Sequence, residues 1–277
     1  MMFLAKIVII LNSCFLMLNC INAQLLQPPQ KFTHKDSLRG TYGASRDWWD
    51  VQRYDLNVKF NFEDSTISGY NKISFKVLKN GTSLQVDLQE PMIADSFKMH
   101  IPNCKVTGAE YAVDFIKDGD AYFLKLDQTV KDEPYSILTV YFHGKPQIAK
   151  RPPWDGGLIW KRSADGSPFV SVACQGLGAS VWYPVKDHQS DEPDNGASIT
   201  ITYPDILVGV ANGKLIKETK SKGYKTSKWL VSLPINSYNL VPYIGKYAHF
   251  NEIYKNIFGI VRYFLYNLLF QCDPIET

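Results

Sequence analysis

The sequence lacks the short motifs that mark the common hydrolase and dinucleotide sites. H-E-x-x-H is absent, and no two of the five histidines lie within five residues of each other, so the chain has no local zinc-binding helix of that kind. The serine motif G-x-S-x-G is absent too, because no glycine follows Ser180 at the required position. Gly176-Leu177-Gly178 has only two of the three glycines of a dinucleotide-binding loop. These absences exclude a catalytic centre built from one contiguous motif, although distant histidines could still converge in space.

An excess of charge of one sign is also missing. The chain has 30 Lys and Arg against 27 Asp and Glu, which is a formal net charge of +3. The basic residues are scattered, without a run long enough to indicate a nucleic-acid site. The composition therefore predicts no nucleic acid as a partner and gives no indication of any other polyanion.

Cysteine is scarce and irregularly spaced. Two of the five cysteines fall in the first 23 residues, and no C-x-x-C pair exists among Cys104, Cys174 and Cys272. Three cysteines allow one disulfide but not a disulfide-stapled scaffold. Which two of them pair stays open.

The first 23 residues have the pattern of a signal peptide. Lys6 supplies the positive charge, residues 7–18 are mostly apolar, and Ala23 is a small residue at the expected cleavage site. The alternatives are a short membrane anchor and a lipoprotein modified at Cys20. We expect cleavage near Gln24, export to the periplasm or the medium, and no stable membrane insertion afterwards.

Alternating apolar and polar residues dominate the chain from residue 46 to residue 250. With 45% hydrophobic residues in 277, the chain can bury a sizeable core. The period of two predicts an all-β, saddle-like antiparallel sandwich of many short strands. The expected strands are 54–62, 73–77, 84–88, 137–142, 199–203, 206–210 and 228–233, with a hairpin over 111–126 that turns at 117–120. Residues 24–45 are expected to form an extended arm, and 251–277 a divergent apolar tail.

Carboxylates and aromatic residues suggest two further sites. Asp187, Asp191, Glu192 and Asp194 could supply the acid pair of a glycoside hydrolase, but they fit a charged surface loop over 186–194 better. A calcium loop is excluded, because Glu192-Pro193 stands where glycine is needed. The aromatic residues could form a carbohydrate platform, or they could belong to the core: Trp154, Trp160, Trp182 and Tyr183.

Five segments in a fixed order carry a family resemblance. They are RDWWDVQRYDLNVKF (46–60), RPPWDGGLIW (151–160), VACQGLGASVWYPVKDHQSDEPD (172–194), VANGKL (210–215) and WLVSLPINSYNLVPYIGKYAHF (229–250). Together they resemble the N-terminal domain of the zinc aminopeptidases of the aminopeptidase N and leukotriene hydrolase family. The resemblance covers roughly residues 45 to 250.

The resemblance implies a fold, a partner domain and one binding residue. In that family the N-terminal domain is a β-saddle that closes one side of the active site of a thermolysin-like zinc domain. Cys174-Gln175 matches the family's Cys-Gln dipeptide, whose glutamine helps to hold the free N-terminus of the peptide substrate. The resemblance therefore assigns substrate binding to Gln175, whose amide oxygen can accept a hydrogen bond from an ammonium group. It assigns no metal ligand and no catalytic residue to this chain, because zinc belongs to the catalytic domain.

The chain departs from the family where the catalytic domain should follow. G-x-M-E-N, H-E-x-x-H with its distal glutamate, and the catalytic tyrosine are all absent, and a truncated or frameshifted gene would produce the short tail. The main hypothesis is thus the N-terminal, substrate-facing domain of an exported zinc metallo-aminopeptidase, inactive alone. The alternatives are a free-standing β-sandwich module for adhesion or carbohydrate binding through Trp154 or Trp160, and a hydrolase that uses Asp191 or Glu192.

Overall fold

A computed structural model describes residues 31–100, 110–126 and 136–248, and the backbone of two strands within 252–263. The predicted signal peptide, Cys104, Cys272, His249 and residues 264–277 of the predicted tail lie outside the described residues. The pattern of contacts divides the chain into one unit that ends at Ser37 and another that begins at Leu38. Within the described residues, no helix is both long enough and apolar enough to cross a membrane.

A short helix, α2 (His34–Gly40), interrupts the segment that was expected to be extended. Thr33 and Asp36 cap its first turn reciprocally: the Thr33 backbone N–H donates to Asp36 Oδ2 at 2.8 Å, and the Asp36 N–H donates to Thr33 Oγ1 at 3.2 Å. This exchange satisfies two backbone groups that the helix itself leaves unpaired. The prediction of an extended arm is therefore wrong over 34–40, because the reciprocal cap of Thr33 and Asp36 favours a helical turn there.

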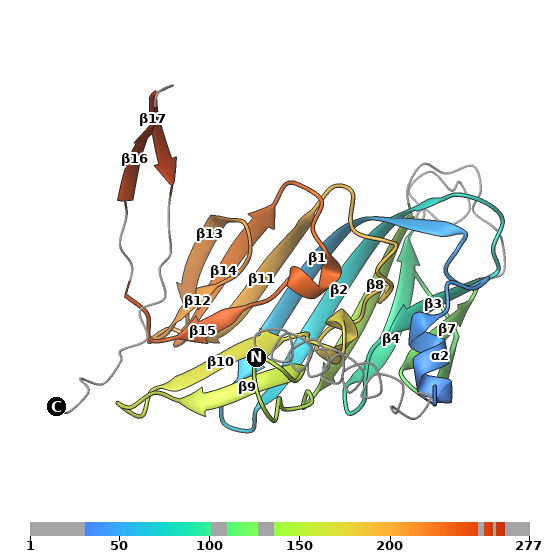
Figure 1. The fold of residues 1–277 in the computed structure, drawn as a ribbon, viewed down its shortest axis with the longest axis horizontal. Helices are drawn as coiled ribbons and strands as arrows, with labels where there is room; N and C mark the ends of the chain where they lie inside the picture. The colour runs from blue at the N-terminus through green and yellow to red at the C-terminus, as the bar shows by residue number, and fades with distance from the viewer. Residues whose placement is uncertain (1–30, 101–109, 127–135, 249–251, 257–258, 264–277) are drawn as a thin grey trace, which may run out of the picture. The chain divides into compact units, whose positions relative to one another are not determined.

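An eight-stranded sheet forms the largest layer, with the order β13-β14-β11-β1-β2-β8-β4-β5 (Figure 1). Neighbouring strands run antiparallel, except that β1 and β11 pair in parallel, with Leu56 beside Ile199. The strands are β1 (Trp49–Asn61), β2 (Thr66–Val77), β4 (Ile93–His100), β5 (Tyr111–Ala112), β8 (Ser136–Gly144), β11 (Ala197–Pro204), β13 (Lys214–Ser221) and β14 (Tyr224–Val231).

Three smaller sheets complete the described part of the chain. The four-stranded sheet has the order β12-β15-β10-β9, the three-stranded sheet β3-β7-β6, and β16 pairs with β17 as a hairpin. Their bounds are β3 (Ser83–Asp87), β6 (Phe115–Asp118), β7 (Ala121–Lys125), β9 (Gly157–Arg162), β10 (Pro168–Ala173), β12 (Val208–Val210), β15 (Tyr243–Gly245), β16 (Glu252–Asn256) and β17 (Gly259–Tyr263). Two single 3-10 turns, η1 (Ala179–Val181) and η2 (Ser237–Asn239), lie in the connections.

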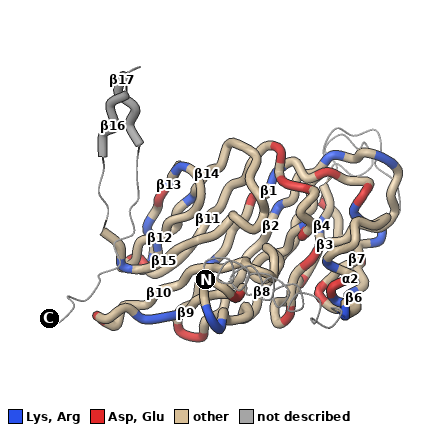
Figure 2. The backbone as a smooth tube through the Cα atoms, in the orientation of Figure 1, with Lys and Arg blue, Asp and Glu red and all other residues tan. Residues whose placement is uncertain are grey.

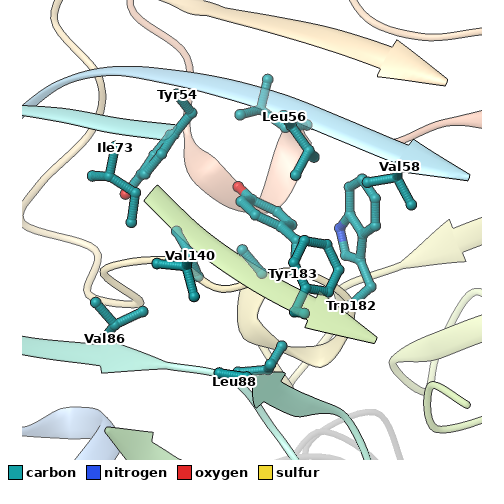
Figure 3. Close-up of a cluster of buried hydrophobic side chains, with 14 of the residues drawn as sticks. Tyr54, Leu56, Val58, Ile73, Val86, Leu88, Val140, Trp182 and Tyr183 are labelled. Carbon is teal, nitrogen blue, oxygen red and sulfur yellow. The ribbon is translucent and has the colours of Figure 1, made fainter. Parts of the chain in front are cut away.

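The core lies against one face of the eight-stranded sheet. Along β1, the residues Tyr54, Leu56, Val58 and Phe60 are fully buried and alternate with more exposed polar ones, as the period of two predicts. Trp182 and Tyr183 pack against this face, and the rings of Tyr54 and Tyr183 meet edge to face with centroids 6.1 Å apart (Figure 3). Buried aromatic rings contribute large apolar areas, so this segment holds the connecting loop onto the sheet.

The predicted fold class is confirmed, and Trp182 and Tyr183 belong to the core, which was one of the two alternatives for the aromatic residues. The strands that the sequence did not reveal are β4, β9, β10, β13, β15, β16 and β17. In β13, seven of the eight residues are exposed and one is half-buried, so no alternation of apolar residues marks it. A strand that is exposed on both faces carries no signal in hydrophobic periodicity.

Candidate functional site

Gln175 lies in a tight turn that follows β10. The Leu177 and Gly178 backbone N–H groups both donate to the Cys174 carbonyl, at 3.1 and 2.9 Å. Gly176 and Gly178 have φ of 70° and 81°, a region that only glycine adopts without strain. Gln175 stands at the tip of this turn with its side chain exposed.

Two side chains from distant elements hold the other end of the turn. The Leu177 carbonyl accepts a hydrogen bond from Arg39 Nη1 at 2.8 Å and from Gln89 Nε2 at 2.5 Å. Gln89 is itself buried and also donates to Ser180 Oγ at 2.8 Å. The turn is therefore fixed to the helix end on one side and to the end of β3 on the other.

Asp187 holds the segment that leads out of the turn. Its Oδ2 accepts hydrogen bonds from the Ser180 N–H at 3.1 Å and the Ser180 Oγ at 2.5 Å, and its Oδ1 accepts from the Ala179 N–H at 3.3 Å. A Cβ at Gly178 would overlap this carboxylate. Glycine at 178 is thus required both by its φ and by the approach of Asp187.

A buried ion pair, Arg46–Asp87, holds the backbone at Asp187. Asp87 Oδ2 accepts from Arg46 Nη2 at 2.5 Å and from the Asp187 N–H at 3.0 Å, and both partners of the ion pair are buried. Burial raises the pKa of Asp87 to about 6, although the guanidinium of Arg46 acts in the opposite direction. The Asp87 carboxylate at the end of β3 therefore fixes the backbone from which Asp187 reaches the turn.

Gln175 separates two recesses of the surface. The larger recess has a volume of about 900 Å³ and is bordered by polar groups that include Arg39, Asp187, His188 and Tyr238. The smaller one, of about 660 Å³, lies on the side of Ile148 and Trp154. Gln175 and Gly176 border both. A ligand in either recess can therefore reach the Gln175 amide.

The loop over 186–194 is not the solvated charged loop that the sequence predicted. Lys186 is fully buried, forms an ion pair with Asp191 and donates to the Trp49 carbonyl at 2.5 Å. Its ammonium group also lies 4.4 Å from the centre of the Trp49 ring, a cation–π contact. Burial lowers the pKa of Lys186, and the Asp191 carboxylate opposes this shift. Only part of the loop is on the surface, where Glu192 and Asp194 are exposed.

This arrangement contradicts the prediction that the carboxylates could form a catalytic pair. Asp191 is buried, accepts from the Val51 N–H at 3.2 Å and is neutralised by Lys186, so it has a structural role. Asp187 is occupied by the Ser180 and Ala179 donors. Of the two exposed carboxylates, Asp194 accepts a hydrogen bond from Gln52 Nε2 at 3.0 Å, which leaves Glu192 without a second free carboxylate to act as its pair.

The four predicted platform aromatics do not form one surface. Trp182 and Tyr183 are in the core, and Trp160 packs half-buried against Phe62 with ring centroids 5.3 Å apart. Trp154 is the exception, because 78% of it is exposed at the edge of the smaller recess. A shared carbohydrate platform is therefore ruled out, and Trp154 is the one of the four whose ring is open to solvent.

The described residues around Gln175 include one thiol, that of Cys174, and no cluster of metal ligands. Burial raises the pKa of Cys174 to about 12, so this thiol is not a nucleophile at neutral pH. Among the described residues, no group of three or more His, Cys, Asp and Glu side chains is placed to hold a metal ion. The described residues thus bring together no ligand set for zinc, the metal that the resemblance places in a separate catalytic domain.

Sequence analysis missed Arg39, Asp87 and Gln89, which hold the Gln175 turn. They lie 88 to 138 residues from their partners along the chain, and no local pattern marks such contacts. The available signal was the alternation of Asp87 and Gln89 with apolar residues along 84–89, which places both polar side chains on one face of a strand.

Comparison with known proteins supplies fold relatives only from solved structures. No family model matches the chain, and no curated protein matches it. A variant of an M1 zinc metallopeptidase from Deinococcus radiodurans superposes with a TM-score of 0.63 at 17% identity, over 81% of this chain and 48% of that one. The same enzyme variant bound to a Tyr-Ser-Ala substrate superposes with a TM-score of 0.62 at 17% identity, over 79% of this chain and 47% of that one. Yeast LTA4 hydrolase superposes with a TM-score of 0.56 at 17% identity, over 79% of this chain and 34% of that one.

These neighbours confirm the resemblance that the sequence predicted. The shared structure is that of zinc metallopeptidases of the M1 type and of LTA4 hydrolase, and at this level of identity the likeness establishes the fold. The chain spans about half the length of the M1 metallopeptidases and a third of the yeast enzyme.

Proposed function

We propose that this chain is the N-terminal, substrate-cleft-closing domain of an exported zinc metallo-aminopeptidase, which removes N-terminal residues from peptides. One observation carries the proposal: in a fold shared with M1 zinc metallopeptidases, Gln175 is exposed between two recesses at the tip of a rigidly held turn. The reaction itself is assigned to a thermolysin-like zinc domain outside the described residues. On this proposal the chain is inactive alone.

Gln175 would bind the free N-terminus of the peptide. Its amide oxygen can accept a hydrogen bond from the ammonium group, and its NH₂ group can donate to a peptide carbonyl. Hydrogen bonds to charged groups are the stronger ones, at about 1.5–3 kcal/mol. Because Arg39, Gln89 and Asp187 hold the turn, Gln175 would meet the peptide with little loss of backbone entropy.

The test measures aminopeptidase activity and peptide binding together. The purified chain is assayed on aminoacyl chromogenic substrates with zinc, alone and mixed with a separately expressed M1 catalytic domain. We expect activity only in the mixture. Gln175→Leu should raise KM for the mixed enzyme roughly tenfold or more, since it removes a hydrogen bond to a charged group. Binding to the chain alone is followed by NMR with Tyr-Ser-Ala, which should perturb the 174–178 amides more than its N-acetylated form does.

Gln189→Leu is the matched control, because Gln189 is another exposed glutamine on the border of the larger recess. It should leave KM within about twofold. Equal effects of the two substitutions would contradict the role of Gln175. Zinc-dependent turnover by the chain alone would overturn the assignment of catalysis to another domain. Failure to restore activity, together with neutral-glycan binding that Trp154→Ala abolishes, would favour the free-standing binding module instead.

A further inference from the structure

The outer face of the eight-stranded sheet gathers lysines that are far apart in the sequence. We define the lysine face by three ammonium groups and the hydroxyls between them: Lys59, Lys217 and Lys228, with Thr200, Thr202, Thr219 and Thr226. The face spans β1, β11, β14 and β13, so it runs from the middle of the sheet to its edge (Figure 2). Sequence analysis found only scattered basic residues, because strand pairing and not chain order brings these together.

Strand register places these side chains in two adjacent rows. The first row runs Asn57, Thr200, Lys228, Lys217 across the four strands, and the second runs Lys59, Thr202, Thr226, Thr219. Strands are about 4.8 Å apart and same-face residues about 7 Å apart along a strand, so the rows form one continuous surface.

Side-chain contacts confirm that the residues of the second row lie on one face. The hydroxyls of Thr202 and Thr226 lie 2.9 Å apart, and the Lys59 ammonium lies 4.6 Å from the centre of the Tyr224 ring. In β14 the alternate residues Ser227 and Trp229 are buried on the opposite, core-facing side.

Two features of the face indicate that it is a binding surface. Lys217 and Lys228 are direct cross-strand neighbours, and like charges in that position destabilise a sheet. Among the described residues, none of the three lysines of the face forms an ion pair. An anionic ligand would supply the missing counter-charge for all three.

Protection of an exposed sheet edge does not account for the arrangement. Lysines on an edge strand discourage pairing with other chains, and β13 is such an edge. That reason covers Lys217, but Lys228 is on the second strand and Lys59 on the fourth. The interior lysines need another explanation.

We propose that the lysine face binds an anionic polysaccharide, one that carries carboxylate or sulfate groups. The ammonium groups would pair with the anionic groups, and the threonine hydroxyls can bond to sugar hydroxyls, although the mutual bond of Thr202 and Thr226 already uses the donor of one of them. The two rows present no apolar side chain to insert into a lipid bilayer. The Lys59 ammonium lies over the nearby Tyr224 ring, so this ring is not open for stacking of a nucleic-acid base. This surface is separate from the Gln175 site and does not depend on the proposed peptidase role.

The experiment measures binding of the purified chain to dextran sulfate and to polygalacturonate by biolayer interferometry, with neutral dextran as the reference. Binding to at least one anionic polymer is expected, weakening roughly tenfold or more as salt rises from about 50 to about 300 mM. The triple variant K59Q/K217Q/K228Q should bind about tenfold more weakly or worse. The triple arginine variant at the same positions should retain binding, because it keeps the charges.

The control variant K125Q/K145Q/K161Q removes the same charge from exposed lysines elsewhere and should stay within about twofold of the wild type. Unchanged thermal melting shows that each variant is folded. Equal losses in the two triple glutamine variants would mean that net charge alone is responsible, which would overturn the proposal. So would binding to neutral dextran as strong as to the anionic polymers, or tighter binding to anionic vesicles or to single-stranded DNA.

Discussion

At the residue scale, charged side chains inside the protein determine the shape of the candidate site. The pairs Arg46–Asp87 and Lys186–Asp191 are both buried, and each also bonds to backbone groups of the segments it joins. Removing one partner of a buried pair leaves an uncompensated charge, which is strongly destabilising. These pairs therefore link the loop over 186–194 to the strands that carry the core.

Asp87 gives a pH dependence with a definite sign. Its pKa is raised in the folded state to about 6, from an ordinary value of 3.8. Between these values the folded protein binds the proton and the unfolded chain does not. Protonation of Asp87 therefore adds to the free energy of unfolding, by at most about 3 kcal/mol. This stabilisation is complete below about pH 4 and is lost as the pH rises through about 6.

The comparison of wild type with Asp87→Asn isolates this contribution. In urea unfolding, the stability advantage of the wild type over the variant should shrink between about pH 4 and pH 7. An advantage that grows with pH would show that the Arg46 guanidinium outweighs burial and that the folded pKa lies below 3.8. The variant also loses stability because Arg46 then lies beside a neutral amide. This loss does not change with pH, so it does not affect the slope of the stability difference against pH.

At the scale of the element, the turn over 174–178 depends on one glycine more than on the others. Gly178 has a positive φ and also meets the Asp187 carboxylate, whereas Gly166 has a similar φ of 79° with open space around it. We expect Gly166→Ala to lower the free energy of unfolding by about 1 kcal/mol and Gly178→Ala by roughly 1–2 kcal/mol more.

Urea unfolding of the two variants measures this difference. Gly178→Ala should also weaken Tyr-Ser-Ala binding, because displacement of Asp187 releases the turn that carries Gln175. An equal loss of unfolding free energy in the two alanine variants would show that the Asp187 side chain moves aside without cost. The turn would then not be held by Asp187.

The elements also show where sequence reasoning succeeds and where it stops. Strand β1 was predictable, because one of its faces is buried and its apolar residues alternate. Strand β13 was not, since both of its faces meet solvent. Lys186 was assigned to the surface on its charge alone, although Asp191, five residues away, makes its burial possible. The substrate-binding role of Gln175 stays a prediction from the family resemblance, and the residues that hold its turn come from distant segments and have no local signal.

At the scale of the whole molecule, one sheet separates two candidate surfaces. The inner face of β1 packs Tyr54 against Tyr183, in the segment that leads to Asp187 and the larger recess. The outer face of the same strand carries Lys59. A polymer held on the outside would therefore leave the Gln175 turn open to peptides.

This separation predicts that the two binding events are independent. Saturating dextran sulfate should change the Kd of Tyr-Ser-Ala, followed by NMR, by less than about twofold. A tenfold change in either direction would show that the sites are coupled through the sheet or that the polymer enters the recess. Neutral dextran at the same concentration controls for viscosity and crowding.

Strand register connects the inside of this protein to its outside. Lys228 and Trp229 are neighbours in β14, and their pairing with Thr200 and Ile199 of β11 decides which of them meets the core. A slip of one residue would bury the ammonium group and expose the indole, at a cost of several kcal/mol. Burial of the apolar residues of β14 therefore also fixes the positions of the lysines on the opposite face. A chain with this strand out of register is less stable, so the charge pattern is set by folding and before any ligand binds.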